Sequence, residues 1–274
     1  MTGRLFIVAT PIGNLGDVSE RALETLRGVK LVACEDTRHT RGLLSRYGIG
    51  TPVTSLPAFA EGQRAGALLE RLAAGDDVAL VTDAGTPAIS DPGEKLVAEA
   101  VAAGVVVVPV PGAAALIAAL SASGLPTGRF HFLGFLPRQG SEASAMLEEV
   151  RQLSATLVLY ESPRRLSETL ALLERCLGAR RAVVARELTK LHEEFVRGTL
   201  PELVARYAGA EVLGEVVVMV EGRTGEVRWS EAEVRAALAR GLADGERLKP
   251  LTTELAKRAG WPAGDLYRLG LSLK

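Results

Sequence analysis

The chain has 274 residues, of which 47% are hydrophobic and 4% aromatic, and its formal net charge is −1. This length allows one large core or two medium ones, and an apolar content carried by Ala, Val, Leu and Gly is typical of α/β proteins. A charge so close to zero excludes binding to a polyanion through overall attraction, so any nucleic-acid surface must be local.

The first half of the sequence is predicted to alternate short apolar strands with amphipathic helices. Strands are expected at Leu5–Ala9, Lys30–Cys34, Val78–Thr82 and Val105–Val110. Helices are expected from Asp17, where Glu20 would complete a capping box, and at Glu61–Ala74 and Glu94–Ala103. Because the strands are apolar on both faces and helices separate them, we expect a mostly parallel sheet.

The second half has more strands per helix, which predicts a mixed sheet. Strands are expected at Phe130–Leu136, Thr156–Tyr160, Arg181–Arg186, Phe195–Arg197 and Val216–Val220, and helices near Glu142–Leu153, Pro163–Leu177 and Pro201–Tyr207. We therefore predict an α/β fold class with two α/β domains, residues 1–120 and 121–224, and a ligand cleft between them.

The remaining residues, 225–274, are predicted to form a small helical domain. A break at residues 258–262 separates two short helices, as in a helix-turn-helix. This region contains nine Lys or Arg and seven Asp or Glu. Because the basic excess is small, a capping subdomain and a nucleic-acid-binding domain remain equal alternatives.

Two features of the sequence bear on its compartment. The apolar run Leu5–Ala9 is too short for a signal peptide or a membrane span. The two cysteines, Cys34 and Cys176, lie far apart and make no metal or disulfide pattern. We expect a cytoplasmic protein with no membrane partner and no metal.

Polar turns follow the four strands of the first half: TPIGNLGD, EDTRHT, DAGTPAISDPG and PVPGAAA. Strand ends of a parallel sheet share one edge, so these turns predict a ligand site. Neither a G-x-G-x-x-G nor a P-loop motif is present, and Pro11 has no N–H to offer a phosphate. A carboxylate, a hydroxyl and close backbone approach suit an adenosine-like body with a cationic or zwitterionic end, such as S-adenosylmethionine. These groups come from Asp83, Thr86, Gly85 and Pro111–Gly112.

Several segments together resemble the tetrapyrrole methylase superfamily. They are LFIVATPIGNLGDVSERALETL, EDTRHTRGLLSRYGI, VTDAGTPAISDPG, YESPRR, ARELTKLHEEFVRG and GEVVVMVEG, in that order. More narrowly, they resemble its small-subunit rRNA branch, which 2′-O-methylates the ribose of a cytidine. The resemblance implies an S-adenosylmethionine-dependent homodimer that acts on the decoding region of 16S rRNA, naked or within the 30S subunit.

The resemblance also implies which residues bind the cofactor. From the first domain these are Pro11, Asp83, Gly85, Thr86, Pro87, Pro111, Gly112 and Ala113. From the second domain they are Tyr160, Glu161, Glu187, Leu188, Gly214 and Glu215. The chain departs from the family pattern at Ala58, Phe59, Ala60, Ala113, Arg138, Gln139 and Arg164. The first three replace a His and an Asn from which a base or an RNA contact would otherwise be drawn.

Methyl transfer to a ribose hydroxyl needs in-line alignment and a group that accepts the proton. We predict a catalytic set of Glu35, Asp36, Arg38, His39 and, from the second domain, Lys190. His39 or one carboxylate would take the proton, while Arg38 and Arg41 would hold RNA phosphates. The alternative is an internal ion-pair network in which Glu35 or Asp36 pairs with Arg38 and His39 begins a helix.

Two other functions stay open. One is a superfamily methyltransferase that acts on a tetrapyrrole carbon or a protein side chain, although TPIGNL lacks the glycine-rich character of the tetrapyrrole branch. The other is a non-catalytic module that senses an adenosyl ligand or holds RNA. The polar EDTRHT segment at a strand end favours chemistry over sensing.

Overall fold

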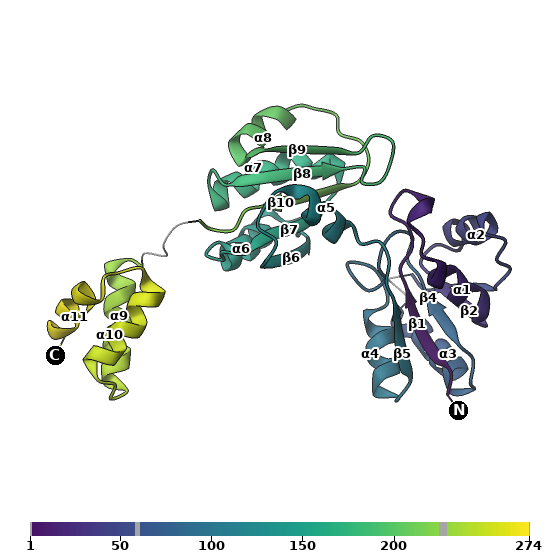
Figure 1. Cartoon of the computed structure of the whole chain (residues 1–274), viewed down its shortest axis with the longest axis horizontal. Coiled ribbons are helices and arrows are strands. Elements are labelled where there is room, and N and C mark those ends of the chain that lie inside the picture. The colour runs from purple at the N-terminus through teal and green to yellow at the C-terminus, as the bar shows by residue number, and fades with distance from the viewer. Residues whose placement is uncertain (1, 58–60, 225–228, 274) are drawn as a thin grey trace. The chain divides into compact units, whose positions relative to one another are not determined.

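The computed structural model of the chain describes residues 2–57, 61–224 and 229–273. It forms two compact units (Figure 1). The first comprises residues Met1–Arg151 and Ala155–Gly222, and the second Gln152–Ser154 and Arg223–Lys274. The division of the chain into three domains stays a prediction.

The first unit begins with a five-stranded sheet in which every pairing is parallel. Its strands are β1 (Arg4–Val8), β2 (Leu31–Cys34), β3 (Val53–Ser55), β4 (Val78–Leu80) and β5 (Val106–Val110), in the order β3-β2-β4-β1-β5. The helices are α1 (Glu20–Gly28), α2 (Thr37–Arg46), α3 (Glu61–Ala73) and α4 (Glu94–Ala102). The predicted parallel sheet is confirmed, whereas β3 was not predicted.

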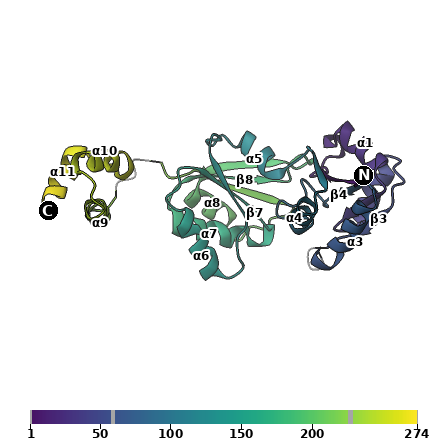
Figure 2. The same ribbon diagram turned by 90° about the horizontal axis from the view of Figure 1, so that it is seen from below.

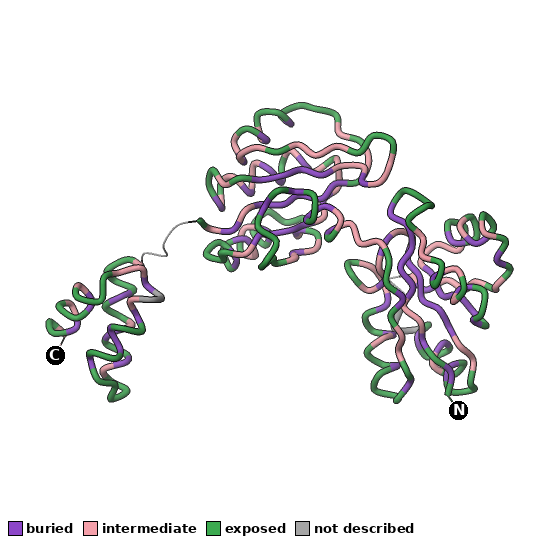
Figure 3. The backbone as a smooth tube through the Cα atoms, in the orientation of Figure 1, coloured by how far each residue is buried: buried purple, intermediate pink, exposed green. Residues whose placement is uncertain are grey.

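Alternate side chains of these strands face two different helix layers. Leu5, Leu31 and Leu80 pack with α3 and α4, while Val8, Val32 and Ala79 pack with α1 and α2. The fully buried patterns of β2 and β4 follow from this double cover (Figure 3). All parallel strands end at the same edge, which is where the polar turns begin.

The second sheet of the first unit is mixed, as predicted. It contains β6 (Phe130–Phe135), β7 (Thr156–Glu161), β8 (Arg181–Arg186), β9 (Glu194–Thr199) and β10 (Val216–Val220), in the order β6-β7-β10-β8-β9. Within this sheet the β6–β7 pairing is parallel, and the other described pairings are antiparallel. The helices are α5 (Ala115–Ser123), α6 (Gly140–Val150), α7 (Leu166–Leu177) and α8 (Leu200–Tyr207).

Helix α5 covers one face of this sheet and α6, α7 and α8 cover the other (Figure 2). Along β10, Val217 and Met219 face α5, whereas Val216, Val218 and Val220 face the other three helices. Ile12, from the turn after β1, packs into the α5 cluster. The first turn of the first sheet therefore touches the core of the second.

The second unit holds α9 (Glu231–Ala243), α10 (Leu248–Ala259) and α11 (Ala263–Leu271) around a core of its own. Gly260 has a left-handed φ of 62° and ends α10, at the predicted break. The helical character of this stretch was predicted, but α9 was not predicted as a separate helix. No helix in the described part of the chain is long and apolar enough to cross a membrane.

The predicted start of the first helix was wrong. Helix α1 begins at Glu20, and Ser19 is its N-cap because its hydroxyl accepts the Ala22 N–H at 3.1 Å. Asp17 instead ends a short 3-10 turn, Leu15–Asp17, whose cap is Asn14. The predicted start at Asp17 lies between the two residues that act as caps, Asn14 and Ser19.

Candidate functional site: an acidic cavity between two sheets

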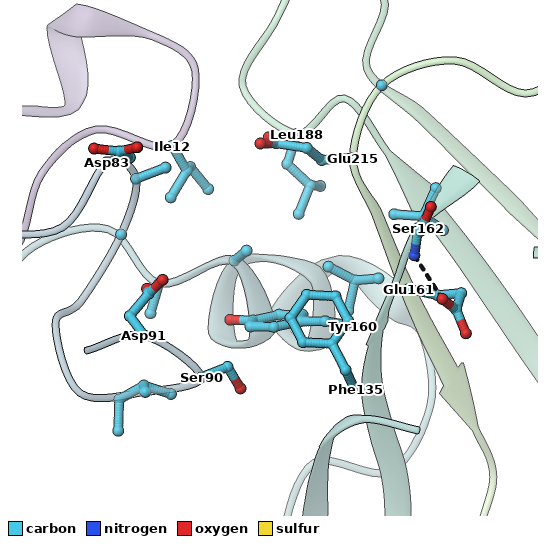
Figure 4. Close-up of a pocket in the computed structure, with 18 of the residues that line it drawn as sticks. Ile12, Asp83, Ser90, Asp91, Phe135, Tyr160, Glu161, Ser162, Leu188 and Glu215 are labelled. Atoms are coloured by element: carbon cyan, nitrogen blue, oxygen red, sulfur yellow. Dashed lines mark hydrogen bonds between the residues drawn. The ribbon is translucent and has the colours of Figure 1, made fainter. Parts of the chain in front are cut away.

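A cavity of about 340 Å³ lies within the first unit, at the carboxyl edge of the parallel sheet. The first sheet contributes Ile12 after β1, the loop after β4, and Ala114 and Ala115 after β5. The second sheet contributes Phe135, Tyr160–Pro163, Leu188 and Gly214–Val217. Figure 4 shows these side chains converging from both sheets. The cavity is therefore a two-sided cleft of the kind expected at the ends of parallel strands.

The three turns of the first sheet that reach the cavity are joined by hydrogen bonds. Thr10 and Gly85 form a two-way backbone bridge, with N···O distances of 2.9 and 3.1 Å. The Thr10 hydroxyl donates to the Thr82 carbonyl at 3.1 Å. The Thr86 hydroxyl donates to the Ala113 carbonyl at 3.1 Å, which ties the turn after β4 to the turn after β5. These bonds fix the wall of the cavity relative to the sheet.

The loop 83–93 has unusual backbone geometry. Gly85 and Gly93 have φ values of 87° and 128°, and the non-glycine residues Ala88 and Ser90 have φ values of 68° and 62°. A Cβ atom on Gly93 would lie 2.5 Å from Leu80 Cδ2. Left-handed non-glycine residues cost free energy and cluster at ligand-binding loops. This loop places Asp83, and further along it Asp91, in the cavity wall.

Tyr160 and Phe135 form the opposite wall, and the Tyr160 ring also packs against Phe132. The Tyr160 hydroxyl accepts the Leu116 N–H at 3.2 Å, so Tyr160 is anchored to the start of α5. Its ring lies 4.9 Å from Phe132 edge-on and 5.7 Å from Phe135. Burial raises the pKa of this phenol, and the negative charge of Asp91 adds to the effect. Tyr160 is therefore a fixed, neutral wall of the cavity.

Glu161 is in the cavity lining, but its carboxylate is committed to the protein. It is only 3% exposed, and it accepts the Ser162 N–H at 2.7 Å and the Thr169 hydroxyl at 2.5 Å. Arg165 Nε lies 3.7 Å away. These contacts hold the turn after β7, so Glu161 shapes the cavity rather than presenting a charge to it.

The turn after β8 forms a network of three charged groups. Lys190 Nζ lies 2.9 Å from Glu187 Oε1 and 3.1 Å from Glu215 Oε2. The Glu187 carboxylate also accepts the Glu215 N–H at 3.1 Å. The hydrogen bond from Lys190 lowers the pKa of Glu187. The network holds Gly214 and Glu215 in the cavity wall.

The charge of the cavity lining has one sign. Asp83, Asp91, Glu161 and Glu215 are acidic, and no Lys, Arg or His occurs among its lining residues as the structure describes them. Burial, together with repulsion from Glu35 and Asp83, raises the pKa of Asp91 to about 6. Such a surface favours a ligand with a positive charge and disfavours phosphate.

The predicted cofactor residues divide into two groups. Eight line the cavity: Asp83, Gly85, Thr86, Tyr160, Glu161, Leu188, Gly214 and Glu215. Six lie within three positions of a lining residue in the chain but are not part of the lining: Pro11, Pro87, Pro111, Gly112, Ala113 and Glu187. Their role in cofactor binding stays a prediction.

Sequence reasoning missed several lining residues. They are Ile12, Ala84, Ile89, Ser90, Asp91, Ala114, Ala115, Phe135, Ser162, Pro163, Val216 and Val217. Asp91 could have been found, because it is the second carboxylate of the DAGTPAISDPG turn. Nothing in the sequence marked Phe135 and Val217 as site residues, because both belong to ordinary apolar strand patterns.

The EDTRHT segment lies beside the cavity, outside its lining. Asp36 is the N-cap of α2, and its carboxylate accepts the Arg38 N–H at 2.7 Å and pairs with the Arg38 guanidinium at 2.8 Å. The ion pair considered as the alternative is thus present, and His39 lies in the first turn of α2. The segment reaches the cavity through one bond, from the Asp36 N–H to the Asp83 carboxylate at 3.3 Å.

Glu35 is the member of this segment with a perturbed carboxyl group. It is half-buried, and burial raises its pKa, with further repulsion from Asp83 and Asp36. The structure therefore brings Glu35, Asp83 and Asp91 into one electrostatic cluster. It does not bring Lys190 to this cluster, because Lys190 is paired with Glu187 and Glu215 on the second sheet. The catalytic roles of these residues stay predictions.

The departures from the family pattern are only partly visible. Ala58, Phe59 and Ala60 lie outside the described residues. Arg164 lies in a 3-10 turn, Pro163–Arg165, and Gln139 is the N-cap of α6. Within the described ranges, no group of three or more His, Cys, Asp or Glu side chains is placed to hold a metal ion.

The family model for tetrapyrrole (corrin/porphyrin) methylases matches residues 4–204. The chain belongs to the tetrapyrrole methylase family. It is 46% identical over 275 residues to a ribosomal RNA small subunit methyltransferase I of Synechocystis sp., covering 99% of each chain. It is 43% identical over 272 residues to the protein of that name from Halalkalibacterium halodurans, covering 97% and 94% of the two chains. This tetrapyrrole methylase uses S-adenosylmethionine as its methyl donor.

Solved structures share the fold of this tetrapyrrole methylase at low identity. A diphthine synthase superposes with a TM-score of 0.63 at 19% identity, covering 97% of this chain and 100% of the other. A uroporphyrin-III C-methyltransferase from Thermus thermophilus, complexed with S-adenosylhomocysteine, gives 0.58 at 20% identity, covering 80% and 97%. These likenesses establish the fold alone.

Proposed function

We propose that the chain binds S-adenosylmethionine in the acidic cavity and transfers its methyl group to the ribose 2′-hydroxyl of a cytidine in the decoding region of 16S rRNA. The names of relatives that are 46% and 43% identical over nearly the whole chain support the rRNA acceptor. The choice of a cytidine ribose rests on the motifs quoted above. The acidic cavity between the two sheets is the observation that supports this donor site.

The residues of the cavity fit this cofactor. A volume of about 340 Å³ lies in the range of small-molecule sites, and Ile12, Leu188 and Val217 offer apolar surface to a purine. The acidic lining offers carboxylates to an ammonium or a sulfonium, and none of the described lining residues offers a cation to a phosphate. A nucleoside with a positively charged tail meets both conditions.

When bound, the cofactor would supply a methyl group on a positively charged sulfur, and in-line transfer of that methyl group to the acceptor oxygen would leave a neutral thioether. The protein must align the acceptor hydroxyl and accept its proton, and alignment alone is worth up to ~7–11 kcal/mol in well-oriented systems. Glu35 and His39 are the proposed proton acceptors at the edge of the cavity. The exposed Arg38 and Arg41 are proposed to hold rRNA phosphates.

We also propose that the protein acts as a homodimer in the cytoplasm, where 16S rRNA and the 30S subunit are its partners. The alternative acceptors, a tetrapyrrole carbon or a protein side chain, are supported only by structures at about 20% identity. A non-catalytic binding module is disfavoured by relatives that are named as methyltransferases.

The test is methyl incorporation from labelled S-adenosylmethionine into unmodified 30S subunits and into naked 16S rRNA, followed by nucleoside mass analysis. We expect 2′-O-methylcytidine. A base-methylated nucleoside, or no incorporation into either acceptor, would contradict the proposed acceptor.

A blocking variant tests the donor site separately. Ala115→Trp places an indole in the cavity at the start of α5, and it should abolish donor binding. Ile117→Trp is the matched control, because Ile117 lies on the same helix, is 50% exposed and does not line the cavity. Equal donor affinity in the two variants would show that the donor binds elsewhere.

A further inference from the structure

Asp91 stands apart from the other acids of the cavity. It lies near the end of the loop 83–93, two residues before the N-cap of α4, and its side chain lines the cavity (Figure 4). The hydroxyl end of Tyr160 points toward it from the opposite wall, and its charge raises the pKa of that phenol. The Asp91 carboxylate therefore faces the space in which we place the donor.

The other acidic lining residues already have partners. Glu161 accepts two hydrogen bonds and lies near Arg165. Glu215 pairs with Lys190, and Asp83 accepts the Asp36 N–H. Across the described ranges, Asp91 makes no ion pair with any Lys, Arg or His.

The surroundings of Asp91 oppose its negative charge. Glu35 approaches from the end of β2 and Asp83 from the same loop, and both act on it as negative charges. Tyr160 faces it from β7 as a neutral phenol. Burial is the largest effect that disfavours the ionised form of Asp91. An ionised carboxylate in this position lowers the stability of the protein, which is typical of a group retained for binding.

We propose that the Asp91 carboxylate binds a positively charged group of the methyl donor, an inference that rests on the proposed function of the cavity. The donor offers two such groups, the sulfonium and the α-ammonium. Either would supply the positive charge that the side chains around Asp91 do not supply. Donor binding then couples to the proton of Asp91. Because only the ionised form binds the cation, donor affinity falls as the pH drops through the pKa of about 6.

Isothermal titration calorimetry of the full chain with S-adenosylmethionine tests the proposal. At about pH 7.5, Asp91→Asn should weaken donor binding roughly ten- to hundredfold, the range for a lost charge-assisted hydrogen bond. Between about pH 7.5 and 5.5, wild-type affinity should fall, whereas the affinity of Asp91→Asn should stay level. Glu99→Gln is the matched control, because Glu99 is an exposed acid on α4 outside the cavity, and it should behave like the wild type.

The product S-adenosylhomocysteine identifies the group that is bound, since it keeps the ammonium and lacks the sulfonium. Weakened binding of S-adenosylmethionine alone in Asp91→Asn assigns the sulfonium, and equal weakening of both ligands assigns the ammonium. Wild-type affinity for both, with the pH dependence intact, overturns the proposal.

A melting-temperature measurement and a comparison of donor binding in two variants distinguish this inference from its alternatives. Asp91→Asn should raise the melting temperature at about pH 7.5, because it removes a repelled charge, whereas loss of a structural carboxylate would lower it. If Ala115→Trp also leaves donor binding unchanged, the donor site itself is wrong. If Ala115→Trp abolishes binding while Asp91→Asn does not weaken it, only the role of Asp91 is wrong.

Discussion

At the scale of single residues, Gly214 shows how closely the cavity wall is packed. Its φ is 88°, and a Cβ atom there would lie 2.1 Å from Glu187 Oε1, the atom that accepts the Glu215 N–H and pairs with Lys190. A side chain at this position must displace the Glu187 carboxylate. The glycine is therefore required by a neighbour as well as by its backbone.

Gly214→Ala should lower both the stability and the donor affinity. The left-handed backbone alone costs ~1–2 kcal/mol, and overpacking adds ~1–3 kcal/mol. Gly209→Ala is the matched control, because Gly209 has a φ of 69° and open space around its Cβ position. Denaturant unfolding should show a larger loss for Gly214→Ala, with reduced donor affinity in that variant alone; equal losses would contradict the packing argument.

At the scale of elements, the turns after β4 and β5 are held together by the Thr86 hydroxyl. Thr86→Val removes this bond and leaves the Ala113 carbonyl without its donor, a change worth ~0.5–1.5 kcal/mol, so donor affinity should fall by up to about tenfold. Thr25→Val removes a comparable bond to the Arg21 carbonyl within α1, away from the cavity. Calorimetry should find donor affinity unchanged in Thr25→Val. An equal loss of donor affinity in both variants would contradict the role of the Thr86–Ala113 hydrogen bond in shaping the cavity.

The start of α2 should make stability depend on pH. The hydrogen bonds from Arg38 lower the pKa of Asp36 from 3.8 to about 2. A depressed carboxyl pKa contributes stability that is present above the unfolded value and is lost as the pH falls through the folded value. The melting temperature of the wild type should therefore exceed that of Asp36→Asn at about pH 5, and the difference should shrink toward pH 2. A difference that does not change with pH would contradict this account of Asp36, since Asn also caps helices.

The elements also show what the sequence can and cannot predict. Strands β1, β2, β4 and β5 are apolar on both faces, and that pattern predicted the parallel sheet and the shared edge at which the turns meet. Helix α5 escaped prediction because its Ala-rich run lacks an amphipathic stripe. Helix α2 was left open because its polar start reads as a catalytic cluster and as an N-cap equally well.

The lining from the first sheet was predictable from residue types, whereas the lining predicted on the second sheet (Tyr160, Glu161, Leu188, Gly214 and Glu215) came only from the family resemblance. Asp83, Gly85 and Thr86 follow a strand, and their residue types mark a site. Phe135 and Val217 line the cavity because two sheets, separated by long stretches of chain, pack through Ile12 and α5. Packing between distant segments leaves no local pattern, so the placement of Phe135 and Val217 needed the structure.

At the scale of the whole molecule, each of the two units has its own core. Within the described part of the chain, the clusters beneath both sheets contain no residue beyond Val220, and α9, α10 and α11 enclose a separate cluster. All cavity residues belong to the first unit. A chain truncated after Gly222 should therefore fold and bind the donor within about twofold of the full chain, because the units are independent in their packing.

Thermal unfolding and calorimetry of the truncated chain measure this directly. Methyl incorporation into 30S subunits by the same truncated chain then shows whether the helical unit contributes to use of the rRNA acceptor. A truncated chain that does not fold, or that folds and loses the donor, would contradict the assignment of the whole donor site to the first unit.

The central claim is that the donor binds between the two sheets. A crystal structure of the full chain with S-adenosylmethionine tests it most directly. We predict density for the donor in the cavity, between the loop that carries Asp83 and Asp91 and the wall formed by Tyr160 and Leu188. Density for the donor at any other place, or crystals grown with saturating donor that contain none, would contradict the account.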